Sequence, residues 1–338
     1  MKTAVVILNW NGKDFLSRFL PSVLEHSRDL AEVVVADNAS EDGSVAMLKD
    51  RFPEVRIIRH PENGGFSKGY NDALRQVDAE YYVLLNSDVE VTENWIAPIV
   101  EMMDADPAIA ACQPKIRSWH ERNKFEYAGA AGGFIDAYGY PFCRGRIFDV
   151  LEEDHGQYND ACEVFWATGA CLFVRSELYH ALGGLDEDFF AHMEEIDFCW
   201  RLKNAGHRIM YCPDSVVFHV GGGALPRESP RKTYLNFRNN LLLLVKNLSA
   251  KKLGWVLSIR YLLDMFAFMV FLMKGQPANG RAVWAAHAHF LRSLPRFMQK
   301  RKGLRQVRAG QVYRGSIVFE HFVRGVRAYS DLRTEKLR

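Results

Sequence analysis

Short apolar runs and amphipathic segments alternate along the first 94 residues of the chain. Runs rich in β-branched residues at 4–8 and 32–37 predict buried strands, whereas residues 15–26 carry apolar positions at helical spacing. The same alternation continues as helix, strand, helix and strand at 44–52, 55–60, 67–77 and 81–88. Strands and helices that alternate at such short spacing predict a parallel sheet covered by helices.

The pattern becomes mixed after residue 94. We expect helices at 95–104, 177–184 and 192–206, and strands at 109–113, 170–176, 208–212 and 216–220, around an aperiodic stretch at 115–162. Residues 227–338 are predicted to be helical and are rich in aromatic and basic residues. We therefore predict an α/β domain over residues 1–226, with halves 1–94 and 95–226, followed by a helical C-terminal region over 227–338.

The composition is that of a folded globular protein. Of the 338 residues, 48% are apolar and 25% are charged, which excludes a disordered chain, a collagen-like repeat and a disulfide-stapled mini-protein. The six cysteines include no C-x-x-C pair, so we expect reduced structural cysteines rather than a zinc cluster. The first apolar run is short and is followed at once by Asn9 and Asn11, which predicts a cytoplasmic protein that begins with a strand.

Charge is divided unevenly along the chain. Residues 227–338 carry 23 Lys or Arg and 5 Asp or Glu, so their net charge is +18 and that of residues 1–226 is −16. A strongly basic region points to an anionic surface as a partner. Nucleic acid is the rival partner, but no nucleic-acid-binding module is evident, and we expect no nucleic acid to bind.

An apolar stretch at 253–273 has about the 20 residues needed to cross a bilayer. Arg260 and Asp264 interrupt it at a spacing that lets them pair on one helix face. A helix lying in the membrane interface fits these charges better than a spanning helix, and a helix packed on the α/β domain is an equal alternative. Anionic lipid headgroups would suit the basic residues that follow, namely Arg292, Arg296, Lys300, Arg301, Lys302, Arg305 and Arg308.

Polar residues gather at the carboxyl ends of the predicted strands, where sheets of this kind bind ligands. They occupy positions 9–12, 37–40, 63–65 and 86–88, and neither a P-loop nor a G-x-G-x-x-G motif follows the first strand. Asp88, two residues after Asn86, could hold a divalent cation that bridges a diphosphate. The alternative is that these residues only form a turn or a helix cap.

A second acidic group, Glu194, Glu195 and Asp197, lies at the start of a predicted helix. Asp197 is spaced to pair with Arg201, which predicts a structural role and leaves one of the glutamates free to act as a base. Favourable charge at the helix N-terminus is the alternative reading of the group. His219 precedes three glycines, which is typical of backbone approaching a ligand or of a mobile loop, although a lone histidine is more often a core residue.

Taken together, these segments resemble a bacterial family 2 glycosyltransferase with the GT-A fold, in the rhamnosyltransferase-like branch. The resemblance extends in order over about the first 240 residues. It rests on the segments VVILNWNG, VVVADNASEDGS, ENGGFSKGYNDAL, VLLNSDVEV, ATGACLFVRSELYHALGGLDEDFF, HMEEIDFCWRLKNAG and VFHVGGG. It implies an α/β, mostly parallel, nucleotide-diphospho-sugar transferase-like sheet, and the basic helical extension predicted from the sequence follows it.

The resemblance also implies roles for individual residues. Asp88 and His219 would hold Mn²⁺ or Mg²⁺, with Asn86 in place of the first acidic residue of the family's D-x-D motif. Glu195 would be the base, with Glu194 beside it. The nucleotide-sugar would be bound by Asn9, Asn11, Asp37, Asn38, Ser40, Gly64, Gly65, Asn71 and Asn86. Trp166, Thr168 and Gly169 would shape the sugar and acceptor site.

The implied reaction is transfer of a sugar from a nucleoside diphosphate to a glycan or lipid-linked acceptor, by a single displacement with inversion, in cell-surface polysaccharide synthesis. Asp37 fits the ring N–H of a pyrimidine, which favours UDP or dTDP sugars. With its basic region, the protein is expected to be peripheral on the inner face of the cell membrane. Two alternatives are a sugar nucleotidyltransferase and a non-catalytic nucleotide- or carbohydrate-binding protein of the same fold.

Overall fold

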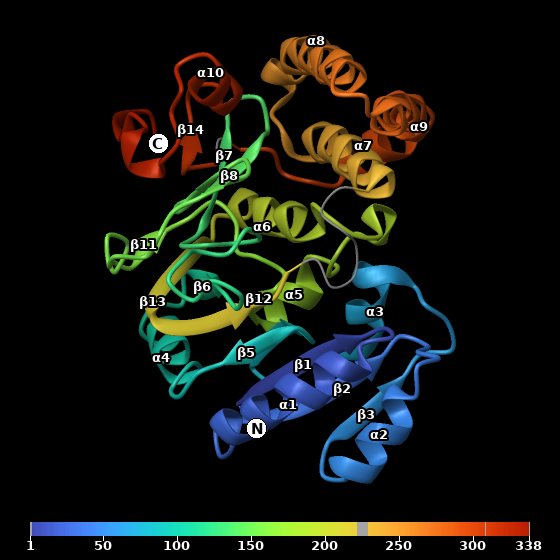
Figure 1. Cartoon of the computed structure of the whole chain (residues 1–338), viewed down its shortest axis with the longest axis vertical. Helices are drawn as coiled ribbons and strands as arrows, with labels where there is room; N and C mark the ends of the chain where they lie inside the picture. The colour runs from blue at the N-terminus through green and yellow to red at the C-terminus, as the bar shows by residue number, and fades with distance from the viewer. Residues whose placement is uncertain (1, 222–228, 308, 338) are drawn as a thin grey trace.

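The computed structural model describes residues 2–221, 229–307 and 309–337. Its centre is a nine-stranded sheet (Figure 1) in which β5 (Val89–Val91) pairs with β13. The other strands follow the order β11 (Cys162–Glu163), β13 (Arg208–His219), β6 (Ile109–Ser118), β12 (Cys171–Arg175), β4 (Tyr81–Asn86), β1 (Thr3–Asn9), β2 (Ala31–Asp37) and β3 (Arg56–Arg59).

The prediction of a mostly parallel sheet is confirmed. Strands β1 to β4 are all parallel, and β6 is parallel to β13. Strand β12 is inserted between β4 and β6 and is antiparallel to both, which the sequence pattern did not indicate. The predicted strands at 208–212 and 216–220 are corrected to one strand, β13, whose pairing with β6 is interrupted between Cys212 and Val216 around Pro213.

Helices cover both faces of the main sheet. Successive residues of β1 enter different cores, because Val5 packs with α1 (Lys13–Ser27), α2 (Ser44–Arg51) and α4 (Ala97–Ala105), and Val6 packs on the other face. That other face is covered by α3 (Gly65–Leu74), α5 (Ser176–Ala181) and α6 (Glu194–Asn204). Burial of both faces explains the continuous apolar runs in the central strands.

A second, five-stranded sheet fills most of the stretch that looked aperiodic. Its order is β10 (Val150–Leu151), β9 (Arg146–Ile147), β8 (Pro141–Cys143), β7 (Gly133–Asp136) and β14 (Val312–Tyr313). These strands have two to four residues each, too few to display a period of two. The last strand, β14, comes from the C-terminal region and pairs in parallel with β7.

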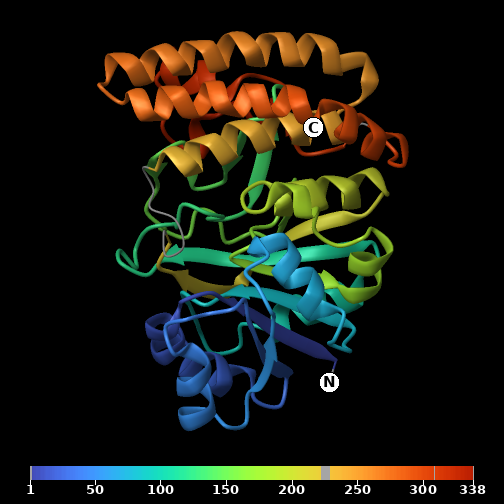
Figure 2. The same ribbon diagram turned by 90° about the vertical axis from the view of Figure 1, so that its right-hand side faces the viewer.

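The C-terminal region forms a layer of long helices at the end of the molecule opposite the N-terminal half (Figure 2). It contains α7 (Pro230–Asn247), α8 (Ala250–Met273), α9 (Pro277–Lys302) and the shorter α10 (Ile317–Phe322). Leu241–Val245 of α7 and Tyr313 of β14 belong to the same hydrophobic core as Phe198 of α6. Residues 229–337 are therefore built into the α/β body. The expected boundary at 226/227 lies outside the described residues.

Several basic side chains of this layer bind the acidic body rather than facing outwards. Lys300 lies 2.5 Å from Asp186 and 2.7 Å from Asp188, and Arg296 lies 2.7 Å from Asp188. Arg301 is buried and donates to the backbone oxygen of Val245. The expectation that all of these bases serve an anionic surface is corrected accordingly, because part of the charge asymmetry is neutralised inside the chain. Arg292, Lys302 and Arg305 remain exposed, and Arg308 lies outside the described residues.

Candidate functional site

The carboxyl ends of β1 and β2 bring five predicted nucleotide-binding residues together. Asn9 and Asp37 are opposite each other in the sheet, and the Asn9 amide donates to Asp37 Oδ1 at 3.1 Å and to Ser40 Oγ at 3.0 Å. The backbone N–H of Asn11 donates to Ser40 Oγ at 2.9 Å. Asn38, the fifth residue, is buried beside Asp37. The result is a fixed polar cluster at the edge of the sheet.

Asn38 extends this cluster to the start of α3. Its amide donates to Asn63 Oδ1 at 2.8 Å and to the Gly65 oxygen at 3.1 Å. Gly65 has φ of +80°, and a Cβ there would lie 2.6 Å from the Phe190 ring. Gly65 therefore lets the segment around Phe190 pack closely against α3, whereas a Cβ on Gly64 would meet the Lys68 side chain.

Asn71 is engaged entirely within the chain. Its amide nitrogen donates to the Leu185 oxygen at 2.8 Å and to Glu187 Oε1 at 3.1 Å. Its amide oxygen accepts from Tyr179 Oη at 2.7 Å and from the Leu185 N–H at 3.0 Å. Because both donors and both acceptor positions are used, Asn71 ties α3 to the segment after α5 and has no spare capacity for a ligand.

Asp88 and His219 lie side by side, as the resemblance implied. Asp88 Oδ1 is 3.1 Å from His219 Nε2, and the Asn86 amide is 3.4 Å from the same nitrogen. The other ring nitrogen, Nδ1, lies 3.1 Å from Glu126 Oε2. Burial lowers the pKa of His219, but the two carboxylates raise it to well above its ordinary value. Gly221 has φ of +72°, and a Cβ there would lie 2.6 Å from Glu126 Oε1.

These residues fit a divalent cation. Two neighbouring ligands of an octahedral ion at about 2.1 Å would be about 3.0 Å apart, close to the 3.1 Å between Asp88 Oδ1 and His219 Nε2. Glu126 holds Nδ1, as a carboxylate commonly does behind a metal-ligating histidine, and this leaves Nε2 to exchange its proton for a metal. Among residues 2–221, 229–307 and 309–337, no group of three or more His, Cys, Asp and Glu side chains could hold a metal ion alone. Substrate oxygens and water are the kinds of ligand that would complete the coordination of such an ion.

The two glutamates at the start of α6 have raised pKa values. Burial, followed by the charge of Glu195, holds the pKa of Glu194 well above its ordinary value, and burial raises the pKa of Glu195 to about 7. The buried Oε2 atom of each glutamate has no hydrogen-bond partner. Glu195 Cβ is 3.8 Å from where a Cβ on Gly169 would lie. Glu195 therefore combines a position beside Gly169 with a pKa suited to accepting a proton near neutral pH.

The predicted structural role of Asp197 is confirmed. Its side chain is fully buried, and Oδ2 accepts from Arg201 Nε at 2.8 Å. Lys246 and Asn247 of α7 also bind this carboxylate, each at 2.8 Å. Asp197 therefore joins α6 to α7 as well as pairing within its own helix.

The segment that leads into the two glutamates has a strained backbone. Phe190, His192 and Met193 have φ values of 65°, 68° and 73°, which non-glycine residues rarely adopt. The Asn239 amide of α7 donates to the backbone oxygens of Phe189, Ala191 and His192 at 2.7–3.0 Å. On the other side, the Phe66 N–H donates to the Phe190 oxygen at 2.9 Å. The strained segment, residues 189–193, is thus held by α3 and by α7.

Two residues predicted to shape the sugar site face into the fold instead. Trp166 is buried, and its Nε1 donates to the Phe134 oxygen at 2.9 Å. Thr168 is also buried, with its Oγ1 accepting from the Ala170 N–H at 3.2 Å. Of the three predicted residues, Gly169 is the one that lies beside Glu195.

Several buried polar atoms without hydrogen-bond partners lie at this site. They include Asn9 Oδ1, His192 Nε2, Glu194 Oε2 and Glu195 Oε2. Burying a polar group without a hydrogen bond is costly, so such atoms call for a ligand or water. The site therefore extends from the β1–β2 edge to the N-terminus of α6.

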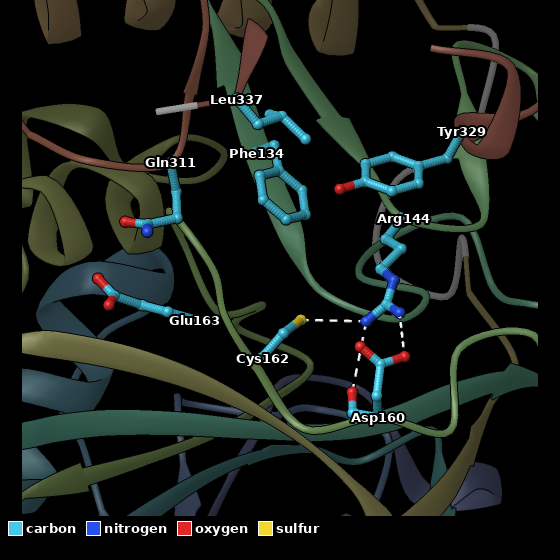
Figure 3. A pocket seen from close by; sticks show the side chains of 8 residues that line it. All are labelled: Phe134, Arg144, Asp160, Cys162, Glu163, Gln311, Tyr329 and Leu337. Atoms are coloured by element: carbon cyan, nitrogen blue, oxygen red, sulfur yellow. Dashed lines mark hydrogen bonds and ion pairs between the residues drawn. The ribbon is translucent and has the colours of Figure 1, made fainter. Parts of the chain in front are cut away.

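A cavity of about 350 Å³ lies elsewhere, between the two sheets and the end of the chain (Figure 3). Its lining cation, Arg144, is already paired with Asp160 and Cys162 Sγ, and two other lining residues, Glu163 and Gln311, bind Lys203 from outside the lining. Its lining residues are Phe134, Arg144, Asp160, Cys162, Glu163, Gln311, Tyr329 and Leu337. None of the predicted site residues lines it.

The sequence did not reveal Glu126, His192 or Asn239. Glu126 lies in the stretch without periodicity, far from His219 along the chain. His192 stands one residue before the acidic group, and Asn239 is one polar position within a long helix. Each is identified by its contacts, so the spacing of residues along the chain could not have found them.

Comparisons with known proteins bear on the family and the fold. The sequence model of glycosyl transferase family 2 matches residues 4–180. N-acetylglucosaminyl-diphospho-decaprenol L-rhamnosyltransferase of Mycobacterium tuberculosis is 27% identical over 230 residues, which are 64% of this chain and 75% of that protein.

Solved structures show the same fold at low sequence identity. GalNAc-T7 with UDP, GalNAc and Mn²⁺ has a TM-score of 0.58 at 18% identity, covering 75% of this chain, and this chain spans 49% of the length of that one. Mannosyltransferase PcManGT of Pyrobaculum calidifontis, with GDP-Man and Mn²⁺, has a TM-score of 0.53 at 16% identity, covering 86% of this chain and 87% of its own.

Proposed function

Given that the chain belongs to glycosyl transferase family 2, with a GT-A fold and a nucleotide-sugar as donor, we propose that it transfers the sugar to a hydroxyl of a glycan or lipid-linked acceptor in cell-surface polysaccharide synthesis. The observation that carries the proposal is the set of polar groups at the strand ends and at the start of α6. The Asn9–Asp37 cluster and the Asp88–His219 pair lie at strand ends, and Glu195, whose buried Oε2 has no hydrogen-bond partner, lies beside Gly169. These are the groups needed to bind a nucleotide, a diphosphate and an attacking hydroxyl.

The nucleoside would lie against the polar cluster at the ends of β1 and β2. Asp37 carries acceptor oxygens that suit the ring N–H of a pyrimidine, which supports a UDP or dTDP donor. Asn9, Asn11 and Ser40 hold this carboxylate and its loop in place. Preorganised partners of this kind reduce the entropy lost when the donor binds.

Asp88 and His219 would hold Mn²⁺ or Mg²⁺ beside the diphosphate. When bound, a divalent cation supplies positive charge that neutralises the leaving diphosphate. The imidazole ligand favours Mn²⁺ over Mg²⁺, which prefers oxygen. Glu126 fixes the orientation of the His219 ring from behind.

Glu195 would take the proton from the acceptor hydroxyl as its oxygen forms the bond to the anomeric carbon. The bond from that carbon to the diphosphate oxygen breaks in the same step. One base opposite the leaving group gives a single displacement with inversion of the anomeric configuration. The pKa of about 7 leaves much of the carboxylate ionised near neutral pH.

The test is an assay of the full chain with UDP-, dTDP- and GDP-sugars and an acceptor sugar linked to a polyprenyl diphosphate, with Mn²⁺, with Mg²⁺ or with a chelator. We expect metal-dependent release of the nucleoside diphosphate and a product of inverted anomeric configuration by NMR. Asp88→Ala should abolish turnover, and Glu101→Gln, an exposed carboxylate on α4, is the matched control.

Three results would contradict parts of this proposal. Turnover only from a sugar phosphate and a nucleoside triphosphate would make the protein a nucleotidyltransferase. Donor binding without turnover of any acceptor would leave a binding protein. A retained anomeric configuration would exclude the single displacement.

A further inference from the structure

Helix α8 buries charged side chains and exposes apolar ones, which is the opposite of a helix on the surface of a soluble protein. Its buried residues are Val256, Arg260 and Asp264, and the two charged side chains are 2% and 0% exposed. Buried charges are costly unless they are paired, and a helix normally turns its apolar face inwards. The contacts of Arg260 and Asp264 therefore decide how α8 is held.

The buried pair anchors α8 on the rest of the protein. Arg260 donates to the Tyr138 oxygen at 3.1 Å and to the Asn240 side chain, and it stacks 3.9 Å from the centre of the Tyr140 ring. Asp264 accepts from Tyr140 Oη at 3.2 Å and lies 3.1 Å from His287 Nε2. Because these partners come from the second sheet, α7 and α9, the inner side of α8 is specified by polar contacts.

The outer side of α8 is a continuous apolar stripe. Trp255, Leu262, Phe266, Met269 and Met273 follow one another at intervals of seven, four, three and four residues, which places them on one helix face. Their exposed fractions run from 52% at Met269 to 74% at Met273. A stripe of this length, left in water, is the mark of an interaction surface.

Exposed apolar side chains are concentrated in this part of the molecule. Of the 16 large hydrophobic side chains that are exposed among the described residues, 13 lie between Trp255 and Val323. They belong to α8, α9, α10 and the residue that follows α10, and both views show α8 as the helix farthest from the N-terminal half (Figures 1 and 2). The surface that these helices form is called the α8 face below.

The exposed charges on α8 and α9, and on the residue between them, have one sign. Exposed Lys251 and Lys252 lie at the start of α8, and exposed Lys274 follows its end. The sequence contains no Asp or Glu between Asp264 and Glu320. An apolar, aromatic stripe bordered by lysines and free of acidic residues complements the interface of an anionic bilayer, where acyl chains meet negative headgroups.

We infer that α8 lies flat in the interfacial layer of an anionic membrane, with Trp255, Leu262, Phe266, Met269 and Met273 inserted among the lipids. The helix is long and apolar enough to span a bilayer. Spanning would, however, tear Arg260 and Asp264 from their partners and place both charges in hydrocarbon. This inference does not depend on the proposed catalytic reaction.

The test is flotation of the full chain with vesicles of phosphatidylcholine alone or with added phosphatidylglycerol. We expect binding to be stronger when phosphatidylglycerol is present. Combining Leu262→Gln, Phe266→Gln and Met269→Gln should weaken partitioning by about a hundredfold, because three apolar side chains no longer leave water. Leu30→Gln, which changes an exposed apolar position in the N-terminal half, is the matched control and should bind as the unaltered chain does.

A second variant allows the inference to be tested even if the first variant does not fold. Changing Lys251, Lys252 and Lys274 to Gln alters exposed side chains only and should weaken binding to the anionic vesicles by about tenfold or more. Brominated lipids should quench tryptophan fluorescence, and Trp255→Phe should reduce the quenching while Trp10→Phe should not. Nucleoside diphosphate release by the variants changed on α8 and at Lys274 should equal that of the unaltered chain.

Several outcomes would overturn the inference. Failure of the full chain to bind either vesicle would overturn it. Binding of the Leu262, Phe266 and Met269 variant as strong as that of the unaltered chain would also overturn it. A dimer in vesicle-free buffer that this variant dissociates, without any vesicle binding, would assign the α8 face to a second copy. Resistance of the natural membrane-bound protein to alkaline carbonate would show a spanning helix rather than one lying flat.

Discussion

Helices α1 and α8 both carry an apolar stripe, yet they present it in opposite directions. The buried residues of α1 are led by Leu16, Phe19, Leu20 and Val23, which pack on the parallel half of the main sheet. The buried residues of α8 include a charged pair, and its apolar stripe faces out. The spacing of apolar residues therefore shows which face of a helix is apolar. Whether that face is buried in the protein depends on the opposite face, because in α8 the opposite face carries a buried charged pair.

The largest effect is expected at Glu195, in the first turn of α6. Glu195→Gln should lower turnover on the order of 10²–10⁴-fold, because the proton acceptor is lost. Between the ordinary pKa of a glutamate and about 7, the folded protein holds a proton that the unfolded chain releases, so the ionised carboxylate destabilises the fold as pH rises. The variant should therefore be more stable above this range, by about 1–3 kcal/mol.

Turnover and thermal unfolding, each measured across pH, check this prediction. Turnover of the unaltered enzyme should rise with pH through about 7, and turnover of the Glu195→Gln variant should not show this rise. Glu194→Gln should have a milder effect and Glu101→Gln none. An active Glu195→Gln enzyme beside an inactive Glu194→Gln one would move the base by one residue.

The next largest effect is expected from breaking the buried pair that anchors α8. Asp264→Ala leaves Arg260 buried without its carboxylate and should cost about 3–5 kcal/mol of unfolding free energy. Replacing both residues by Leu should cost less than the single change, because no charge is then left unpaired. Urea denaturation of the three proteins measures the difference. A cost near zero for Asp264→Ala would mean that α8 is not held by this pair.

A direct comparison of the two stripes comes next. Leu16→Ala opens a cavity under α1 and should cost about 2–5 kcal/mol. Phe266→Ala removes a ring that is 63% exposed and should change stability in lipid-free buffer by no more than about 0.5 kcal/mol. Equal losses in the two variants would show that the outer side of α8 is buried in solution.

A smaller effect is expected where α7 holds residues 189–193. Asn239→Ala removes the amide that binds three backbone oxygens, so Glu195 should lose part of its alignment and kcat should fall by about tenfold. Donor affinity should not change, because the nucleotide cluster lies on other elements. Thr233→Ala, on the same helix, is the matched control. A change in KM with constant kcat would point to a role in binding instead.

The sequence alone predicted the structural features that depend on residues close together along the chain. The four parallel strands followed from local runs, and the Asp197–Arg201 pair followed from helical spacing. The polar residues at the ends of β1 and β2 could be grouped because parallel strands end at one edge of a sheet. What the sequence could not show depends on distant partners. Trp166 was implied to shape the sugar site, and its indole N–H donates to the backbone oxygen of Phe134 in the second sheet.

The same reason explains the charges. Lysines and arginines between residues 292 and 308 form one basic run in the sequence, yet a helix distributes them around its axis. Lys300 and Arg301 point towards the rest of the protein, where Lys300 pairs with Asp186 and Arg301 donates to the backbone oxygen of Val245. A run of charge predicts the sign of a surface only for those residues that the fold leaves outside.

Strand β14 has a consequence for how the molecule is made. Its residues Val312 and Tyr313 are added to β7 beside Ile135 and Asp136, which leave the ribosome much earlier. The parallel half can assemble while synthesis continues, whereas the second sheet stays open until Tyr313 has emerged. Because Asn239 of α7 holds residues 189–193 and Arg260 of α8 contacts the turn between β7 and β8, the segment that leads into Glu194 and Glu195 is fixed late in synthesis. A nascent chain in which the polar cluster of β1 and β2 has already formed is therefore still without an ordered segment before these glutamates.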